Sequence, residues 1–126
     1  LNPSSAASDV YKRQPKWLSN EDLEFFTKEF KKSGMFGPLN KYRCMDLDWE
    51  DLFNLSFDKI KKPSCFITGS LDPVNFFIPG VNLFDSVEKN YDDLRVKEQL
   101  NNIGHWTQQE APEQVNKILL DFLEKI

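Results

Sequence analysis

The sequence predicts an α/β fold, a parallel sheet with helices on its faces, and three segments indicate it. Residues 64–69 (SCFITG) are a short, mostly apolar run bounded by proline and glycine, as expected of a strand buried on both faces. Residues 94–100 alternate apolar and polar side chains, as expected of a strand with one solvated face. Residues 112–126 have the spacing of an amphipathic helix, which completes an order of strands and helices typical of parallel sheets.

Composition limits the class of protein. A chain of 126 residues corresponds to one domain or part of one. The net charge of −4 and the lack of a basic run argue against nucleic-acid binding, and no apolar stretch has the length of a membrane span. Cys44 and Cys65 favour two free thiols in a reducing compartment, so we expect a cytoplasmic location. The 11 phenylalanines indicate an apolar interior or pocket, and we expect neither a cofactor nor a metal.

Residues 1–14 differ from the rest of the chain. They are small and polar and have no apolar period. The run Ser4–Gln14 resembles the in-frame translation of a transposase sequencing adapter, and the alternative is a natural disordered leader. We exclude the segment from the fold in either case and expect natural sequence to begin near Pro15.

Residues 15–58 predict an aromatic, helical section. Ser19 begins the first helix, because the acidic residues after it meet the positive end of the helix dipole and permit a variant of the capping box. Gly34 suits a left-handed cap, and Pro38 suits the first position of a second short helix. The apolar side chains at helical spacing are Leu23, Phe26, Phe30, Leu39, Tyr42 and Met45. A further helical turn or loop packing on a core is expected at Trp49, Leu52, Phe53 and Leu55.

Residues 59–126 supply about two strands. The first strand ends in a Gly-Ser-Leu-Asp-Pro turn, and Val81–Asn90 is a candidate helix before the second. The last helix has one apolar stripe, formed by Val115, Ile118, Leu119, Phe122, Leu123 and Ile126. Two parallel strands are too few for a complete domain, so we expect the N-terminal part of the sheet to be absent from this chain.

Asp72 and His105 are the candidate catalytic pair. Each follows the end of a predicted strand, and open α/β sheets present functional groups at the carboxyl ends of their strands. A carboxylate there can accept the imidazole Nδ1–H, set the tautomer and stabilise the imidazolium. The sequence lacks a convincing nucleophile: it has no Gly-x-Ser-x-Gly elbow, and Ser70 lies too near Asp72 in the same turn.

Each of these residues also has a structural explanation. Taken alone, His105 is more often a loop histidine, and Asp72 before a proline is more often a turn residue. Tyr42 on an amphipathic helix is more often packing than an acid, and Trp106 is more often core or pocket lining than catalytic. Only the joint placement of Asp72 and His105 favours chemistry.

Three segments closely resemble the C-terminal part of epoxide hydrolases of the α/β-hydrolase fold. They are PKWLSNEDLEFFTKEFKKSGMFGPLNKYR, KIKKPSCFITGSLDPV and IGHWTQQEAPEQVNKILLDFL. The similarity covers about residues 15–126 and is weakest over 74–92. The motifs G-x-x-DPV and GHWTQQE indicate the wider hydrolase superfamily, whereas GPLN-x-YR contains the cap-domain tyrosine of epoxide hydrolases.

The resemblance implies domains and roles. Residues 15–58 would be the end of a helical cap domain, and residues 59–126 the C-terminal part of the α/β-hydrolase core. Tyr42 would hydrogen-bond and protonate the epoxide oxygen, Asp72 would orient the base, and His105 would be the base. The nucleophile would be an aspartate that lies upstream of this chain. The oxyanion hole and a second tyrosine would also lie upstream. The implied substrates are a small apolar epoxide and water, which give a vicinal diol through an aspartyl ester.

The sequence departs from the family pattern beside the tyrosine. Cys44 stands where the family commonly has asparagine, and Lys41 where an aromatic residue is common, which affects substrate range more than reaction type.

Other functions stay open. A haloalkane or fluoroacetate dehalogenase lacks the cap tyrosine, and a serine esterase differs in its nucleophile. A truncated product or pseudo-enzyme acting as a scaffold or binding module is the non-catalytic alternative. We expect the 126-residue polypeptide to be inactive alone, because it holds no nucleophile, and poorly soluble, because its first strand exposes an apolar edge.

Overall fold

The computed structural model describes residues 14–55 and 58–126. Residues 1–14, predicted to be a translated sequencing adapter or else a natural leader, therefore lie outside the described residues except for Gln14. The chain divides into two compact units, Leu1–Glu50 and Asp51–Ile126. None of the described helices has the length and apolar composition that crossing a membrane requires.

Helix α2, Asn20–Ser33, begins as predicted, with Ser19 as its N-cap. The Ser19 hydroxyl accepts the Asp22 N–H at 3.0 Å and the Asp22 carboxylate accepts the Ser19 N–H at 3.3 Å, which confirms the capping box. At the other end, Gly34 has φ 71° and ψ 179°. This extended conformation with positive φ suits glycine, but it is not the predicted left-handed helical cap.

Helix α3, Phe36–Arg43, begins earlier than Pro38 predicts. Pro38 is its third residue and not its first. A proline is tolerated there because the N–H groups of the first turn have no partner within the helix. Helix α4, Met45–Leu52, and the 3-10 turn η1, Phe53–Leu55, follow and confirm the predicted helical segment.

The apolar side chains of this helical section are accessible. No residue of α2, α3 or α4 is buried, and Trp49 is 62% exposed. The predicted packing of the last segment on a core is therefore wrong for the described residues, because each of its large apolar side chains is exposed. The side chains concerned are Trp49, Leu52, Phe53 and Leu55, all exposed.

The second unit contains a parallel pair of strands, as predicted. Strand β1, Ser64–Gly69, pairs with strand β2, Leu94–Leu100, and Gly69 lies opposite Leu100 at the carboxyl end. An isolated parallel bridge between Ile60 and Tyr91 precedes the ladder. The α/β prediction is confirmed, and both strands end at the same edge of the sheet.

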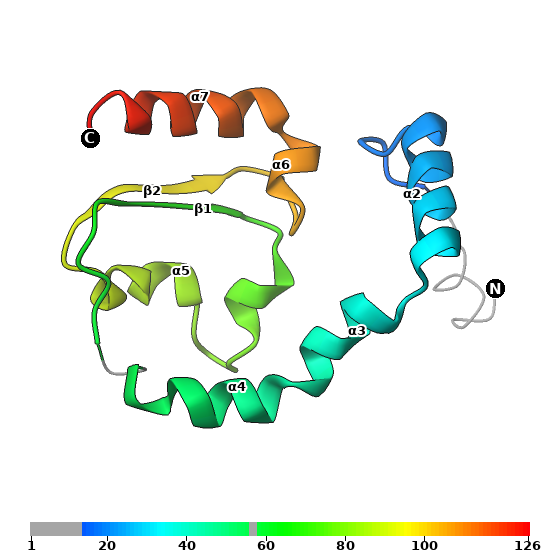
Figure 1. The fold of residues 1–126 in the computed structure, drawn as a ribbon. Helices are drawn as coiled ribbons and strands as arrows, with labels where there is room; N and C mark the ends of the chain where they lie inside the picture. Colours follow the sequence, from blue (N-terminus) through cyan, green and yellow to red (C-terminus); the bar gives the residue numbers. More distant parts are fainter. Residues whose placement is uncertain (1–13, 56–57) are drawn as a thin grey trace. The chain divides into compact units, whose positions relative to one another are not determined.

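Helices cover both faces of this strand pair (Figure 1). Helix α7, Pro112–Leu123, lies on one face. The other face carries η2 (Pro73–Phe76), α5 (Leu83–Ser86) and η3 (Val87–Asn90), and the Phe66 and Phe84 rings lie 6.3 Å apart there. The core on the α7 side consists of Leu100, Ala111 and Val115, with Ile67, Ile103 and Ile118 packed against it.

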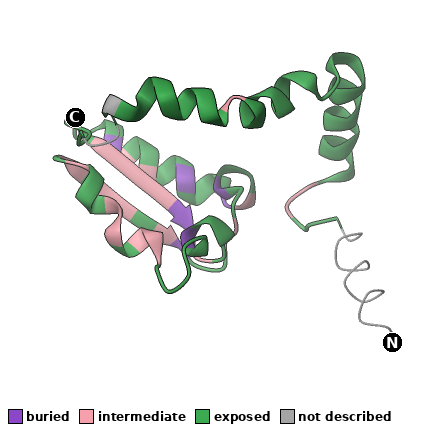
Figure 2. Ribbon diagram, turned by 90° about the horizontal axis from the view of Figure 1, so that it is seen from below, coloured by how far each residue is buried: buried purple, intermediate pink, exposed green. Residues whose placement is uncertain are grey.

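Burial increases along the strands toward their carboxyl ends (Figure 2). Residues 64–67 of β1 are only half-buried, whereas Thr68 and Gly69 are buried. The predicted burial of β1 along its whole length is therefore wrong, since among the described residues β1 has β2 as its only strand partner. The apolar stripe of α7 is likewise buried at Val115 and Phe122, whereas Leu119 and Leu123 are exposed. Ile126, predicted as part of this stripe, lies beyond the end of α7 and is also exposed.

The end of β1 requires glycine. A Cβ at position 69 would lie 2.1 Å from the carbonyl oxygen of Ile103 and 2.2 Å from that of Gly104. Backbone atoms cannot yield as a flexible side chain does. The two loops that follow β1 and β2 therefore approach each other closely only because residue 69 has no side chain.

Gly69→Ala is expected to lower the free energy of unfolding by about 3 kcal/mol, because the methyl group forces two backbone segments apart. Urea denaturation followed by circular dichroism measures the change. Gly37→Ala is the control: apart from its two chain neighbours, a Cβ at position 37 meets nothing within 4 Å. Because the residue before a proline is disfavoured in a helix, we expect a small loss of stability, well below that of Gly69→Ala. Equal stability of the two variants would contradict the close approach at Gly69.

Candidate active site

The turn after β1 holds Asp72 in a fixed orientation. Asp72 is the N-cap of η2, and its Oδ1 accepts the Val74 N–H at 2.9 Å. Pro73 occupies the first turn of η2, where it needs no hydrogen-bond partner. Asp72 is buried, with 8% of its surface exposed. The carboxylate is thus anchored by local backbone geometry before any contact with His105.

Two buried polar side chains, those of Thr68 and Asn75, hydrogen-bond the Asp72 turn to the end of β1. The Asn75 amide donates to the Gly69 carbonyl at 2.9 Å, and the Thr68 hydroxyl donates to the Asn75 oxygen at 3.4 Å. Sequence reasoning did not identify either residue. Asparagine three positions after Asp72 is an ordinary turn residue, and only the fold shows that its side chain is buried and bonded to the end of β1.

The loop that carries His105 is tied to the same turn through the backbone. The Ser70 N–H donates to the Leu100 carbonyl and the Leu71 N–H to the Ile103 carbonyl, both at 2.9 Å. The Ser70 hydroxyl in turn accepts the Asn102 N–H at 2.8 Å. These bonds join residues about thirty positions apart and fix one loop against the other.

His105 and Asp72 are in contact, as predicted. Nδ1 of His105 lies 3.0 Å from Oδ1 and 3.1 Å from Oδ2 of Asp72. A carboxylate can only accept, so the neutral ring donates Nδ1–H, and Nε2 has its lone pair available. The side chain of His105 is 53% exposed and that of Asp72 is 11% exposed. The buried partner therefore orients a ring that solvent can reach.

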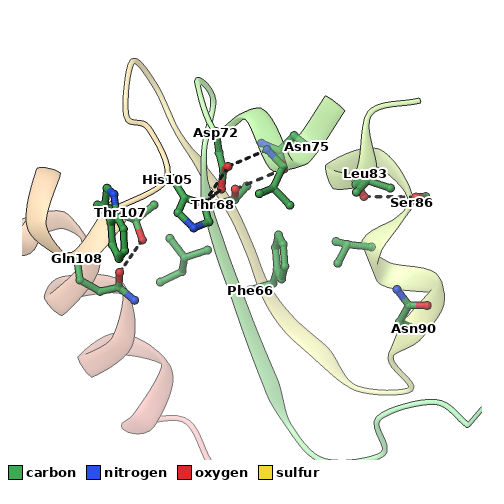
Figure 3. A pocket seen from close by; sticks show the side chains of 14 residues that line it. Phe66, Thr68, Asp72, Asn75, Leu83, Ser86, Asn90, His105, Thr107 and Gln108 are labelled. Carbon is green, nitrogen blue, oxygen red and sulfur yellow. Dashed lines mark hydrogen bonds and ion pairs between the residues drawn. The ribbon is translucent and has the colours of Figure 1, made fainter. Parts of the chain in front are cut away.

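A cavity of about 610 Å³ adjoins the pair (Figure 3). Its lining combines apolar groups such as Phe66, Leu83 and Trp106 with Asp72 and His105. The Trp106 ring packs edge-on against the His105 ring, with centroids 5.4 Å apart. The lining also includes the polar side chains of Thr68, Asn75, Ser86, Asn90, Thr107 and Gln108, so the cavity offers both apolar surface and hydrogen-bonding groups. A concave site that combines the two can bind a small organic molecule.

Ser70 and Cys65 have other roles than that of a nucleophile. The Ser70 hydroxyl braces the histidine loop, as described above. Burial, and secondly the Glu98 carboxylate, raise the pKa of the Cys65 thiol, which disfavours the reactive thiolate. Both cysteines are free thiols, as predicted. Within the described ranges, no group of three or more His, Cys, Asp or Glu side chains is arranged to hold a metal ion.

Tyr42 lies in the other compact unit, near the end of α3. Its side chain is 70% exposed. Arg43, the next residue, places its guanidinium over the Phe36 ring at 5.4 Å, which links the last residue of α3 to its first. The role of Tyr42 stays a prediction.

Comparison with known proteins identifies relatives named epoxide hydrolase. Epoxide hydrolase B of Mycobacterium tuberculosis is 38% identical over 109 residues, which cover 86% of this chain and 30% of that protein. Epoxide hydrolase 1 of Siraitia grosvenorii is 34% identical over 114 residues, which cover 88% of this chain and 36% of that protein. No family model matches the chain.

Solved structures give the same result. Epoxide hydrolase I of potato, Solanum tuberosum, is 30% identical with a TM-score of 0.78 and matches 88% of this chain and 35% of its own. A mutant of the Vigna radiata epoxide hydrolase is 33% identical with a TM-score of 0.80 and matches 91% of this chain and 37% of its own. The chain thus spans about a third of the length of the curated relatives it matches. By sequence and by structure, it is homologous to the epoxide hydrolases of the α/β-hydrolase fold over most of its own length.

Proposed function

We propose that this chain provides the base, its orienting carboxylate and one acid of an epoxide hydrolase that converts an apolar epoxide into a vicinal diol. The observation that supports it most directly is the 3.0 Å contact between His105 Nδ1 and Asp72 Oδ1 at the carboxyl edge of the strand pair. The homology to enzymes named epoxide hydrolase narrows the reaction from hydrolysis in general to epoxide opening.

The first step needs a nucleophile from outside this chain. We propose an aspartate in the part of the enzyme that corresponds to the unmatched length of the relatives. Its carboxylate oxygen attacks an epoxide carbon, the carbon–oxygen bond of the ring breaks, and an ester forms. The ring oxygen leaves as an alkoxide and takes a proton from the Tyr42 hydroxyl. A phenol, with an ordinary pKa of about 10, is acidic enough to protonate an alkoxide.

The second step is assigned to His105 and Asp72. Nε2 of His105 removes a proton from water, and the hydroxide attacks the carbonyl carbon of the ester. Collapse releases the diol and regenerates the nucleophilic carboxylate. The Asp72 carboxylate stabilises the imidazolium until its proton returns to the Tyr42 phenolate through solvent. Because Asp72 is buried and already bonded to the Val74 N–H, it is oriented before the charge develops.

The cavity beside the pair supports an apolar substrate. Phe66, Leu83 and Val87 line it from the sheet and from the α5–η3 segment, and Trp106 lines it from the histidine loop. These apolar side chains can accept the hydrocarbon substituents of an epoxide. Residues 15–58 are proposed as the end of the cap and residues 59–126 as the C-terminal part of the core.

A chimera tests the assignment of the base. The aligned part of epoxide hydrolase B of Mycobacterium tuberculosis is replaced by the corresponding residues of this chain, and turnover of styrene oxide is measured. The chimera is expected to hydrolyse the epoxide, and His105→Ala to lower steady turnover by about 10²–10⁴-fold, because ester hydrolysis loses its base. Mass spectrometry should then detect the trapped alkyl ester on the enzyme.

Two outcomes would contradict this assignment. One is steady turnover in the His105→Ala chimera at the level of the parent chimera. The other is hydrolysis by the 126-residue chain alone that His105→Ala abolishes, because the chain would then contain its own nucleophile. Gln109→Ala is a suitable control, since Gln109 is exposed in α6, shortly after the histidine loop, and does not line the cavity.

Tyr42→Phe in the same chimera tests the acid. Ring opening should slow by up to about 10²-fold while hydrolysis of a preformed ester is unchanged, because the phenol acts only on the epoxide oxygen. Single-turnover kinetics separate the two steps. Slower ester hydrolysis with unchanged ring opening would exclude Tyr42 as the acid. A chain from a dehalogenase, which lacks the cap tyrosine, would instead leave ring opening in the chimera independent of Tyr42.

A further inference from the structure

We propose that Glu110 is a positioning residue that clamps the backbone on both sides of His105 and so keeps the imidazole on Asp72. Only the catalytic consequence, that the clamp positions the base, rests on the proposed function. The clamp itself is a geometric feature of the second unit.

The Glu110 carboxylate binds the two backbone N–H groups that flank the histidine. Its Oε2 accepts the Gly104 N–H at 2.8 Å, and its Oε1 accepts the Trp106 N–H at 3.1 Å. His105 is the one residue between these donors. Both carboxylate oxygens are therefore used on the loop that carries the base, and no side chain of that loop is needed to make the contact.

The local sequence explains why a glutamate can reach there. The short helix α6, Thr107–Glu110, starts directly after Trp106, whose N–H precedes the helix and has no partner within it. The Glu110 N–H bonds the Trp106 carbonyl at 2.8 Å, which brings the side chain back over the first turn. A Cβ at position 104 would lie 2.9 Å from Oε1, so Gly104 leaves the space that the carboxylate occupies.

Glu110 also connects the loop to the core. The next residue, Ala111, is 4% exposed and belongs to the cluster of Leu100 and Val115 that joins β2 to α7. Because Ala111 is fixed in this cluster, the neighbouring Glu110 carboxylate fixes the backbone of the histidine loop relative to the core. The His105 side chain is 53% exposed. A hydrogen bond to such an exposed ring orients it only weakly unless the backbone of the same residue is fixed.

The clamp requires a glutamate and not a side chain of the same size with a single acceptor. A carboxylate has two acceptor oxygens and binds two N–H groups with charge-assisted hydrogen bonds. A glutamine of the same shape has one acceptor and presents its NH₂ group to the second N–H. Glu110→Gln therefore preserves the side-chain volume and removes half of the clamp.

The test uses the single histidine of the chain, which makes its imidazole nitrogens directly assignable. The 126-residue chain is fused to a histidine-free solubility partner, because the chain alone is expected to be poorly soluble. Long-range ¹H–¹⁵N spectra are recorded at about pH 8.5, where an ordinary imidazole is neutral. The wild type is expected to show one tautomer, with Nδ1 protonated and Nε2 unprotonated. Asp72→Asn serves as the reference for loss of the carboxylate. In this variant the asparagine oxygen still accepts the Val74 N–H, and the asparagine NH₂ group faces Nδ1 of His105.

Glu110→Gln is expected to move both nitrogen shifts toward the averaged values of a free imidazole and to abolish the slowly exchanging Nδ1–H signal. Glu113→Gln is the matched control, because Glu113 is exposed in the first turn of α7 and the charge change is the same. The control should keep the wild-type shifts. The amide signals of β1 and β2 should be unchanged in both variants, which separates positioning from folding.

Two results would overturn the proposal. One is an unchanged tautomer in Glu110→Gln. The other is loss of the β1 and β2 amide signals in Glu110→Gln, which would make Glu110 a folding element. Neither depends on catalysis: a clamp confirmed by the spectra in a chain whose chimera opens no epoxide would refute the proposed function and leave this inference standing.

Discussion

Parallel pairing of β1 with β2 is the interaction on which the rest of the second unit depends. Because the strands run in the same direction and Gly69 lies opposite Leu100, the loops that follow them emerge at one edge of the sheet. Asp72 comes three residues after the first strand and His105 five residues after the second. In an antiparallel pair, the same two loops would lie at opposite ends, and no side chain could bridge them.

The backbone holds the two loops together more firmly than the side chains do. Hydrogen bonds from Ser70 and Leu71 to the end of β2 and the loop after it, together with the missing side chain at Gly69, set the separation of the loops. The bond between Asp72 and His105 then forms at a distance that is already correct. For the proposed role of His105 as a base, this matters because a group that its scaffold already positions loses little free energy to reorientation during a reaction.

Polar groups at this edge are buried only where they are satisfied. Asp72, Asn75 and Thr68 are all buried, and each has a hydrogen-bond partner on the same turn or on the end of β1. Among the described residues, no buried side-chain nitrogen or oxygen lacks a partner. His105 differs from these residues because its side chain is exposed, although its Nδ1 is bonded to Asp72. The ring lines the cavity.

The amino-acid sequence by itself determined the local elements. Apolar periodicity and caps located β1, β2, α7 and the start of α2, because these signals depend on residues close together in the chain. The order of these elements also predicted the contact between Asp72 and His105. The tertiary structure alone decided how far each apolar face is covered, which is why β1 is half-buried and the segment around Trp49 is exposed. It alone also showed the roles of Asn75 and Glu110, since a turn asparagine and a helical glutamate have no distinctive sequence pattern. Their partners are backbone groups, and backbone groups become specific only when the fold places them.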